Sequence, residues 1–123
     1  MGAPTVRFAR RDGALRVEVE GESSLESTMA YWSAIEDEVR RAPVPAILLI
    51  DNLRGQALTG EHWRSLVEAL AGHGLERVRI AHVKPRGLQQ IEYCEIYARE
   101  AGFETRVFDN EVPANLWLRY AET

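Results

Sequence analysis

The sequence predicts a single α/β domain spanning residues 1–123, built on a mixed sheet of four to five strands with about four helices. Three observations predict this class. Asp12-Gly13 lies between two β-rich runs, short apolar runs occupy 46–51 and 77–83, and amphipathic stretches alternate with these runs. The resulting order, β-β-α-β-α-β-α-β-α with short connections, is typical of helices packed on a sheet with right-handed βαβ crossovers.

The composition limits the classes of function. The 123 residues are 46% hydrophobic and 28% charged, with a formal net charge of −4. The interspersed charges argue against a nucleic-acid partner, which needs a concentrated basic face. Cys94 is the only cysteine, so neither an intramolecular disulfide nor a cysteine-based zinc site is expected. No run approaches the ~18 apolar residues of a membrane span, and the N-terminus lacks a signal-peptide core. We therefore expect a cytoplasmic protein that does not span a membrane.

The first third of the chain predicts a hairpin followed by a helix. The dipeptide at 12–13 is a strong signal for a two-residue turn, and the residues at 15–19 alternate between apolar and charged, as in a half-buried strand. Ser23 and Glu26 then have the spacing of a capping box at a helix start. Pro43 marks the end of this helix. Its apolar residues recur at helical spacing: Leu25, Met29, Trp32, Ile35 and Val39.

Two buried strands and two further helices follow. The run at 46–51 is almost continuously apolar, as in a central strand covered on both faces, and 77–83 is a second inner strand. Thr59 is the expected N-cap of the helix between them, whose inner stripe consists of Trp63, Leu66, Val67 and Leu70. The stretch 88–102 predicts a third helix with one apolar stripe: Leu88, Ile91, Cys94, Ala98 and Ala101.

The last stretch predicts a strand at 104–108 and a short helix that begins near Asp109. Asp109 can cap the first amides of this helix, and Pro113 is tolerated because first-turn amides have no acceptor within the helix. The apolar side expected to lie against the sheet consists of Leu116, Trp117 and Tyr120.

The segment "RVFDNEVPANLWL" at 106–118 joins a strand that ends in Phe-Asp to an alanine and an aromatic-aliphatic pair. In this pattern it resembles the C-terminus of the SpoIIAA-like proteins, whose fold is STAS-type. The segments "AILLIDNLRG" and "RVRIAHV" lie where the two inner strands of that family would be. As an order of elements, the resemblance spans nearly the whole chain. It implies a STAS-type fold more than any activity.

Better-studied STAS relatives antagonise anti-sigma factors and are switched by phosphorylation of a serine at the start of the second helix. When Asp51 is placed on the family's strand-ending aspartate, "TGEH" at 59–62 lies opposite the family's Asp-Ser-Ser-Gly-like motif. Gly60 and Glu61 then stand where the serines would be, so we expect the phospho-acceptor to be absent. The SpoIIAA-like branch is also related to CRAL-TRIO lipid-binding domains, which implies an apolar or amphipathic ligand.

Open α/β sheets usually bind ligands at the carboxyl ends of their parallel strands. In this chain that edge should collect several charged and polar side chains: Asp51, Arg54, Thr59, Lys84, Arg86 and Asp109. Lys84 and Arg86 precede the third helix, whose free amides favour anions. The pattern therefore fits a site for a phosphate, a carboxylate or a lipid head group. The simpler interpretation is a set of solvated loop charges and turn caps.

The residues most often used in catalysis show no catalytic pattern. His62, His73 and His82 lack the i, i+4 spacing of a helical metal site, and we expect surface or half-buried histidines. Cys94 lies on an apolar stripe, where a cysteine is a small core residue. The sequence contains neither a nucleophile elbow nor a Gly-rich phosphate loop. We expect no catalytic residue, no metal and no cofactor.

The third helix has a broader apolar arc than a small core needs, because Tyr93, Ile96 and Tyr97 add to its main stripe. Such an arc either packs more deeply or forms a homodimer interface. Our first hypothesis is therefore a non-enzymatic SpoIIAA-like regulatory or protein-interaction module, with a protein partner or a second copy of itself. The alternative is a carrier of a small apolar or amphipathic, lipid-like ligand. An enzyme ranks last.

Overall fold

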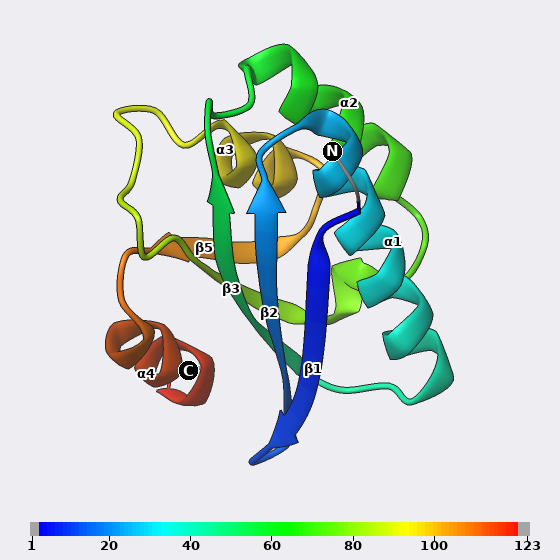
Figure 1. Cartoon of the computed structure of the whole chain (residues 1–123). Coiled ribbons are helices and arrows are strands. Elements are labelled where there is room, and N and C mark those ends of the chain that lie inside the picture. The colour runs from blue at the N-terminus through cyan, green and yellow to red at the C-terminus, as the bar shows by residue number, and fades with distance from the viewer. Residues whose placement is uncertain (1–2, 121–123) are drawn as a thin grey trace.

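A five-stranded sheet with helices on both faces forms the framework of the chain, in a computed structural model that describes residues 3–120 (Figure 1). The strands are β1 (Thr5–Arg11), β2 (Ala14–Glu22), β3 (Ala46–Arg54), β4 (Arg79–Val83) and β5 (Glu104–Phe108). The helices are α1 (Leu25–Arg41), α2 (Gly60–Leu70), α3 (Tyr93–Glu100) and α4 (Glu111–Tyr120), with a 3-10 turn at Leu75–Arg77. The predicted mixed α/β architecture and its element order are confirmed.

The strands lie side by side in chain order. β1 pairs antiparallel with β2, and every later pair is parallel. Asp12 and Gly13 form the hairpin turn with φ of 53° and 81°. A two-residue turn in which both residues have positive φ matches the right-handed twist of the strands, which explains why Asp-Gly is favoured there.

The main core lies between the sheet and the three helices α1, α2 and α3. The period of two along each strand turns Leu15, Val17 and Val19 of β2 toward these helices, together with Ile47 and Leu49 of β3. All five side chains are fully buried. The predicted stripe of α2 is buried, with Val67 and Leu70 in this core and Trp63 and Leu66 in an adjoining cluster. The interior strands identified from the sequence are therefore covered on this face.

The opposite face of the sheet is covered in part by α4 (Figure 1). There, Ala114 is fully buried against a cluster of strand residues: Leu48, Ile50, Ala81 and Val83. Trp117 and Leu118 pack beside Ala114. The predicted inner side of this helix was wrong in two of its three residues, since Leu116 and Tyr120 are exposed. Positions 114, 117 and 118 have the spacing of one helical face, whereas 116 and 117 point to different sides.

Two helix caps lie one residue further along the chain than predicted. Oγ of Ser24, and not of Ser23, accepts a first-turn backbone N–H of α1 at 2.9 Å. Oδ1 of Asn110 accepts the N–H of Val112 at 2.8 Å, in the role predicted for Asp109. The cap predicted at Thr59 is confirmed, and the ring of His62 completes a capping box there. Neighbouring polar residues compete for one cap position, and backbone geometry decides between them.

We expect Ser24→Ala to lower the free energy of unfolding by about 1 kcal/mol, because the first-turn N–H of α1 loses its acceptor. Ser23→Ala is the matched control and should change stability by less than about 0.5 kcal/mol. Urea denaturation monitored by circular dichroism measures both values. Equal losses in the two variants would contradict the assignment of the cap.

The third helix begins at Tyr93, five residues later than the predicted stretch. The carboxylate of Glu92 accepts hydrogen bonds from the backbone N–H of Gln89 and from the ammonium of Lys84. These bonds hold the segment before Tyr93 as a loop. Leu88 and Ile91, predicted as inner helical residues, are each 47% exposed. Every helix in residues 3–120 is too short or too polar to cross a membrane.

Candidate functional site

A buried carboxylate–imidazole pair lies at the carboxyl ends of β3 and β4. Asp51 follows Ile47 and Leu49 on the helix-facing side of β3, and His82 follows Ile80 on the same side of β4. Because Leu49 pairs with His82 in the parallel register, the next residue on that face, Asp51, reaches the imidazole. Nε2 of His82 is 2.9 Å from Oδ2 of Asp51, and the two side chains are 4% and 14% exposed.

The contact between the two groups sets their protonation. Burial disfavours the charged imidazole, but the hydrogen bond with Asp51 and the neighbouring Cys94 outweigh it and raise the pKa of His82 to about 9. Burial would likewise raise the pKa of the Asp51 carboxyl, yet the bond from His82 lowers that pKa below its ordinary value. The backbone N–H of Leu53 also donates to Oδ1 of Asp51, at 3.1 Å. At neutral pH the pair is therefore an ion pair.

Two buried donors on α1 lie beside this pair. The hydroxyl of Tyr31 and Nε1 of Trp32 have no hydrogen-bond partner among the described residues. Burial raises the pKa of Tyr31 well above 10, and the charge of Asp51 adds to this effect. The two rings are tilted on each other with centroids 5.6 Å apart. The hydroxyl of Tyr31 therefore stays protonated next to the Asp51 carboxylate.

A second buried ion pair joins the loop after β4 to the start of α3. Nζ of Lys84 is 2.5 Å from Oε1 of Glu92, and both side chains are mostly buried. The same ammonium lies 5.8 Å from the centre of the Trp63 ring, in a cation–π arrangement. Burial disfavours the charge of Lys84, but the neighbouring Cys94 and Glu92 raise its pKa. The charge of Lys84 is thus held by protein groups on two sides.

Cys94 lies between the two pairs and is 6% exposed, which confirms its prediction as a core residue. Its Sγ donates to Oε1 of Glu92 at 3.6 Å. The neighbours of Cys94 along the chain offer no base, but folding places it close to both His82 and Lys84. The fold thus collects an imidazole, an ammonium, two carboxylates and a thiol within one region of the interior.

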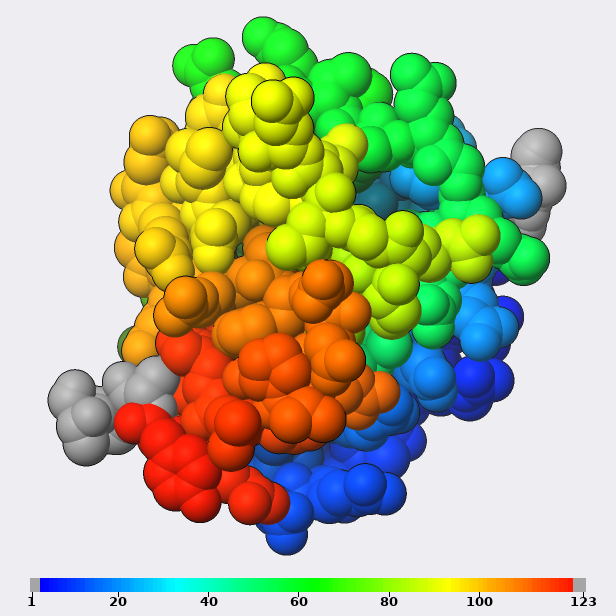
Figure 2. Space-filling model, turned by 90° about the vertical axis from the view of Figure 1, so that its left-hand side faces the viewer, coloured from blue at the N-terminus to red at the C-terminus, as the bar shows by residue number. Residues whose placement is uncertain are grey.

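The surface above these pairs is hollowed into an open depression of about 350 Å³ between the end of β3 and the loop after β4 (Figure 2). Asp51, Lys84 and Arg86 line it, as the sequence predicted for the carboxyl edge of the sheet. Arg54 and Thr59 are exposed and lie outside its lining. Asp109 is likewise exposed and outside it.

The remaining histidines have structural partners. Nδ1 of His62 accepts the backbone N–H of Thr59 at 3.3 Å, and Nδ1 of His73 is 3.0 Å from a carboxylate oxygen of Glu36. The prediction of surface or half-buried histidines is right for His62 and His73 and wrong for His82, which is buried. Within residues 3–120, no three side chains of the metal-binding types are grouped so that they could hold a metal ion.

The predicted interface residues lie on α3, next to the loop that precedes it. Ile96 is 44% exposed, and the half-buried rings of Tyr93 and Tyr97 stack with centroids 6.2 Å apart. Together with the exposed Leu88 and Ile91, they form what we call the 88–97 surface. Figure 2 shows the segment 85–100, in yellow, above β5 and α4 on one face of the molecule. The two tyrosines also pack inward against a buried cluster, as the alternative of deeper packing predicts, and the homodimer interface stays a prediction.

The protein has a SpoIIAA-like α/β fold. A protein of the DUF3478 family from Shewanella loihica PV-4, described as uncharacterized and as having a SpoIIAA-like fold, superposes on it with a TM-score of 0.54. That pair is 18% identical in sequence, over 94% of this chain and 93% of the other. The NMR structure of the protein TM1081 matches with a TM-score of 0.51 and 14% identity, over 98% of this chain and 99% of the other. No family model matches the sequence, and no curated protein matches it.

Proposed function

We propose that this chain is a non-enzymatic SpoIIAA-like interaction module that pairs with a second copy of itself through the 88–97 surface. The observation that supports the proposal best is the exposure of Leu88, Ile91 and Ile96 within nine residues of chain. Exposed apolar side chains gathered in one place are typical of protein–protein interfaces. Two-fold pairing is the commonest assembly of a single chain type.

The arrangement of the buried polar groups supports binding over catalysis. A base, a nucleophile and a charged partner are the usual parts of a nucleophilic site. Here Asp51 and His82 bond to each other, and the charge of Lys84 is held by Glu92. Sγ of Cys94 donates to a carboxylate oxygen of Glu92. The imidazole and the thiol are also buried, with His82 3% and Cys94 6% exposed, so a substrate would reach them only after a rearrangement of the surrounding core.

The contacts at the start of α2 support an interaction module that is not regulated by serine phosphorylation. Gly60 stands at one of the two positions that resemblance assigns to the family's serines. A Cβ atom at Gly60 would lie 3.2 Å from the ring of Tyr93, closer than ordinary van der Waals contact. Thr59 uses its hydroxyl to cap α2. A modifiable hydroxyl at position 60 would therefore have to displace the tyrosine.

The alternative function, a carrier of an apolar or amphipathic ligand, finds less support in the interior. The cavity between the sheet and the helices has a volume of about 40 Å³. Trp32 and Trp63, predicted from the sequence to fill this space, line it. A volume of this size holds about one water molecule, whereas small-molecule sites measure about 300–1,000 Å³. A lipid-like ligand would require the helices to separate from the sheet.

Substituting Ile96→Glu should convert a dimer of this protein into a monomer, because it would place two carboxylates in an apolar interface. Sedimentation equilibrium of the full chain measures the change. Val112→Glu is the matched control, since Val112 is an exposed apolar residue on α4 outside the 88–97 surface. We expect the control to remain dimeric. A monomeric wild-type chain, or dissociation of both variants alike, would refute the proposal.

A further inference from the structure

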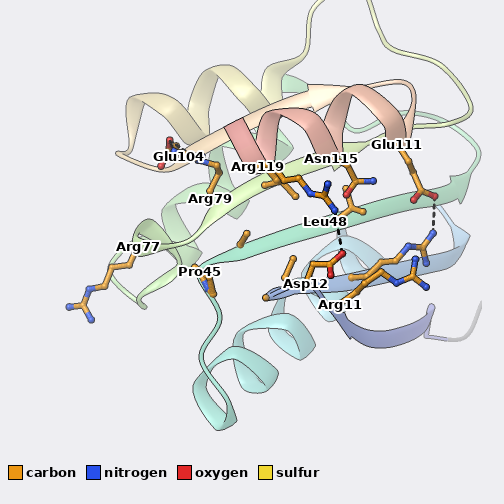
Figure 3. A pocket seen from close by; sticks show the side chains of 15 residues that line it. Arg11, Asp12, Pro45, Leu48, Arg77, Arg79, Glu104, Glu111, Asn115 and Arg119 are labelled. Atoms are coloured by element: carbon orange, nitrogen blue, oxygen red, sulfur yellow. Dashed lines mark hydrogen bonds and ion pairs between the residues drawn. The ribbon is translucent and has the colours of Figure 1, made fainter. Parts of the chain in front are cut away.

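An arginine-lined pocket of about 420 Å³ lies at the opposite end of the sheet, beside α4 (Figure 3). It exists because α4 covers only part of the second face of the sheet, next to the start of β2 and β3. The hairpin turn forms another wall. Four separate parts of the chain direct arginines to its lining: Arg11, Arg16, Arg77, Arg79 and Arg119.

Three carboxylates in the lining neutralise three of these arginines. Each pair is a direct contact: Arg16–Glu111 at 2.8 Å, Arg79–Glu104 at 3.0 Å and Arg119–Asp12 at 3.4 Å. Arg11 and Arg77 form no ion pair with the described residues of the chain. The pocket therefore has an excess of positive charge, although the whole chain has a net charge of −4.

The two unpaired arginines differ in direction. Figure 3 shows Arg77 pointing outward, away from the other labelled side chains, whereas Arg11 lies close to Asp12. Arg16, which is only 25% exposed, is held in place by its bond to Glu111. Arg79 packs over the ring of Trp117, 5.5 Å from its centre. Arg16 and Arg79 are thus fixed by neighbouring side chains, while the exposed Arg11 remains available to a ligand.

The floor of the pocket is apolar, with lining residues Pro45, Ala46, Leu48 and Leu118. An arginine without a carboxylate partner beside an apolar floor matches a ligand that has an oxyanion at one end and an apolar body at the other. We infer that this pocket binds a small organic anion, with its phosphate or carboxylate group on Arg11 and its apolar part against Leu48 and Leu118. The pocket shares no residue with the 88–97 surface, so this inference does not rest on the proposed function.

The test is a titration of the full, isotope-labelled chain followed by two-dimensional NMR of the backbone amides. Phenyl phosphate and benzoate are the probes, because each joins a small apolar ring to one of the two oxyanions. We expect saturable shifts at residues 11–16, 46–48 and 115–119. A tighter complex with phenyl phosphate would assign a phosphate ligand, and a tighter complex with benzoate a carboxylate. Benzyl alcohol, which has the ring without the charge, should bind about tenfold more weakly than the better anion.

Replacing Arg11 tests whether the anions bind in this pocket or are only attracted by the arginines of the surface in general. Arg11→Gln should weaken binding of the better probe about tenfold. Arg7→Gln is the matched control, because Arg7 is an exposed arginine of the same strand outside the pocket, and it should leave binding unchanged. The amide spectra also report whether each variant is folded. Absence of saturable binding by both anions, equal binding of benzyl alcohol, or equal losses in the two variants would overturn the inference.

Discussion

Replacing Asp51 by alanine should lower the free energy of unfolding by about 3 kcal/mol at neutral pH, because buried His82 loses the group that neutralises its charge. The loss lies at the lower end of the range for a broken buried ion pair, since the imidazole can release its proton instead of remaining charged. Urea denaturation of the wild type and the variant measures the difference. A loss below about 1 kcal/mol would contradict a stabilising role for the pair.

Two further variants identify the cause of that loss. Asp51→Asn keeps a hydrogen-bond acceptor for the ring but removes the charge, so its loss should be smaller than that of Asp51→Ala. Tyr31→Phe removes the neighbouring hydroxyl, which has no partner among the described residues, and should change stability by less than about 1 kcal/mol. A large loss in Tyr31→Phe would show that the region is sensitive to any change in packing, and not to the ion pair in particular.

The stability of the protein should also fall in mildly alkaline solution. The pKa of His82 is raised from 6.5 to about 9 in the folded state, so the stabilisation from its bound proton is complete below pH 6.5 and is lost as the pH rises through 9. The expected loss of unfolding free energy between about pH 6 and about pH 10 is on the order of 3 kcal/mol. Denaturation curves at successive pH values measure it.

A variant without the imidazole isolates the contribution of His82 from other groups that titrate in alkali. His82→Gln keeps a donor for Asp51 but cannot release a proton in this range. Its unfolding free energy should therefore depend less on pH than that of the wild type, and the slopes of the two curves should differ most between pH 6.5 and 9. Parallel curves for the two proteins would show that His82 is not the responsible group.

The fold could be predicted because local signals agreed with long-range packing. The Asp12-Gly13 turn, the apolar run at 46–51 and the stripe of α2 each depend on residues close together in the chain. The start of α3 could not be predicted in this way. A helical pattern of apolar residues runs through 88–102, but Glu92 forms bonds to Lys84 and Gln89 that hold the first part of it as a loop. The spacing of apolar residues gives no sign of these bonds, so it predicted a helix that begins too early.

The site was predicted as an edge of the sheet but not as a set of bonded pairs. The sequence placed Asp51 and Lys84 at the same edge, and both line the depression. It did not pair Asp51 with His82. The signal was nonetheless present, because alternation places His82 on the same face as Ile80. When two inner strands are neighbours in a parallel sheet, residues on the same face near their carboxyl ends, here Asp51 and His82, come together. The bond from Lys84 to Glu92 depends on the path of a loop and has no comparable signal.

The order of the elements along the chain has a consequence for biosynthesis. Each strand pairs with the one made just before it, so every new strand finds its neighbour already present as it leaves the ribosome. The far side of β3 and β4 is covered later, because Leu48 and Val83 pack there against α4, which is synthesised after all five strands. Until that helix docks, the nascent polypeptide exposes an apolar surface of the kind that chaperones bind.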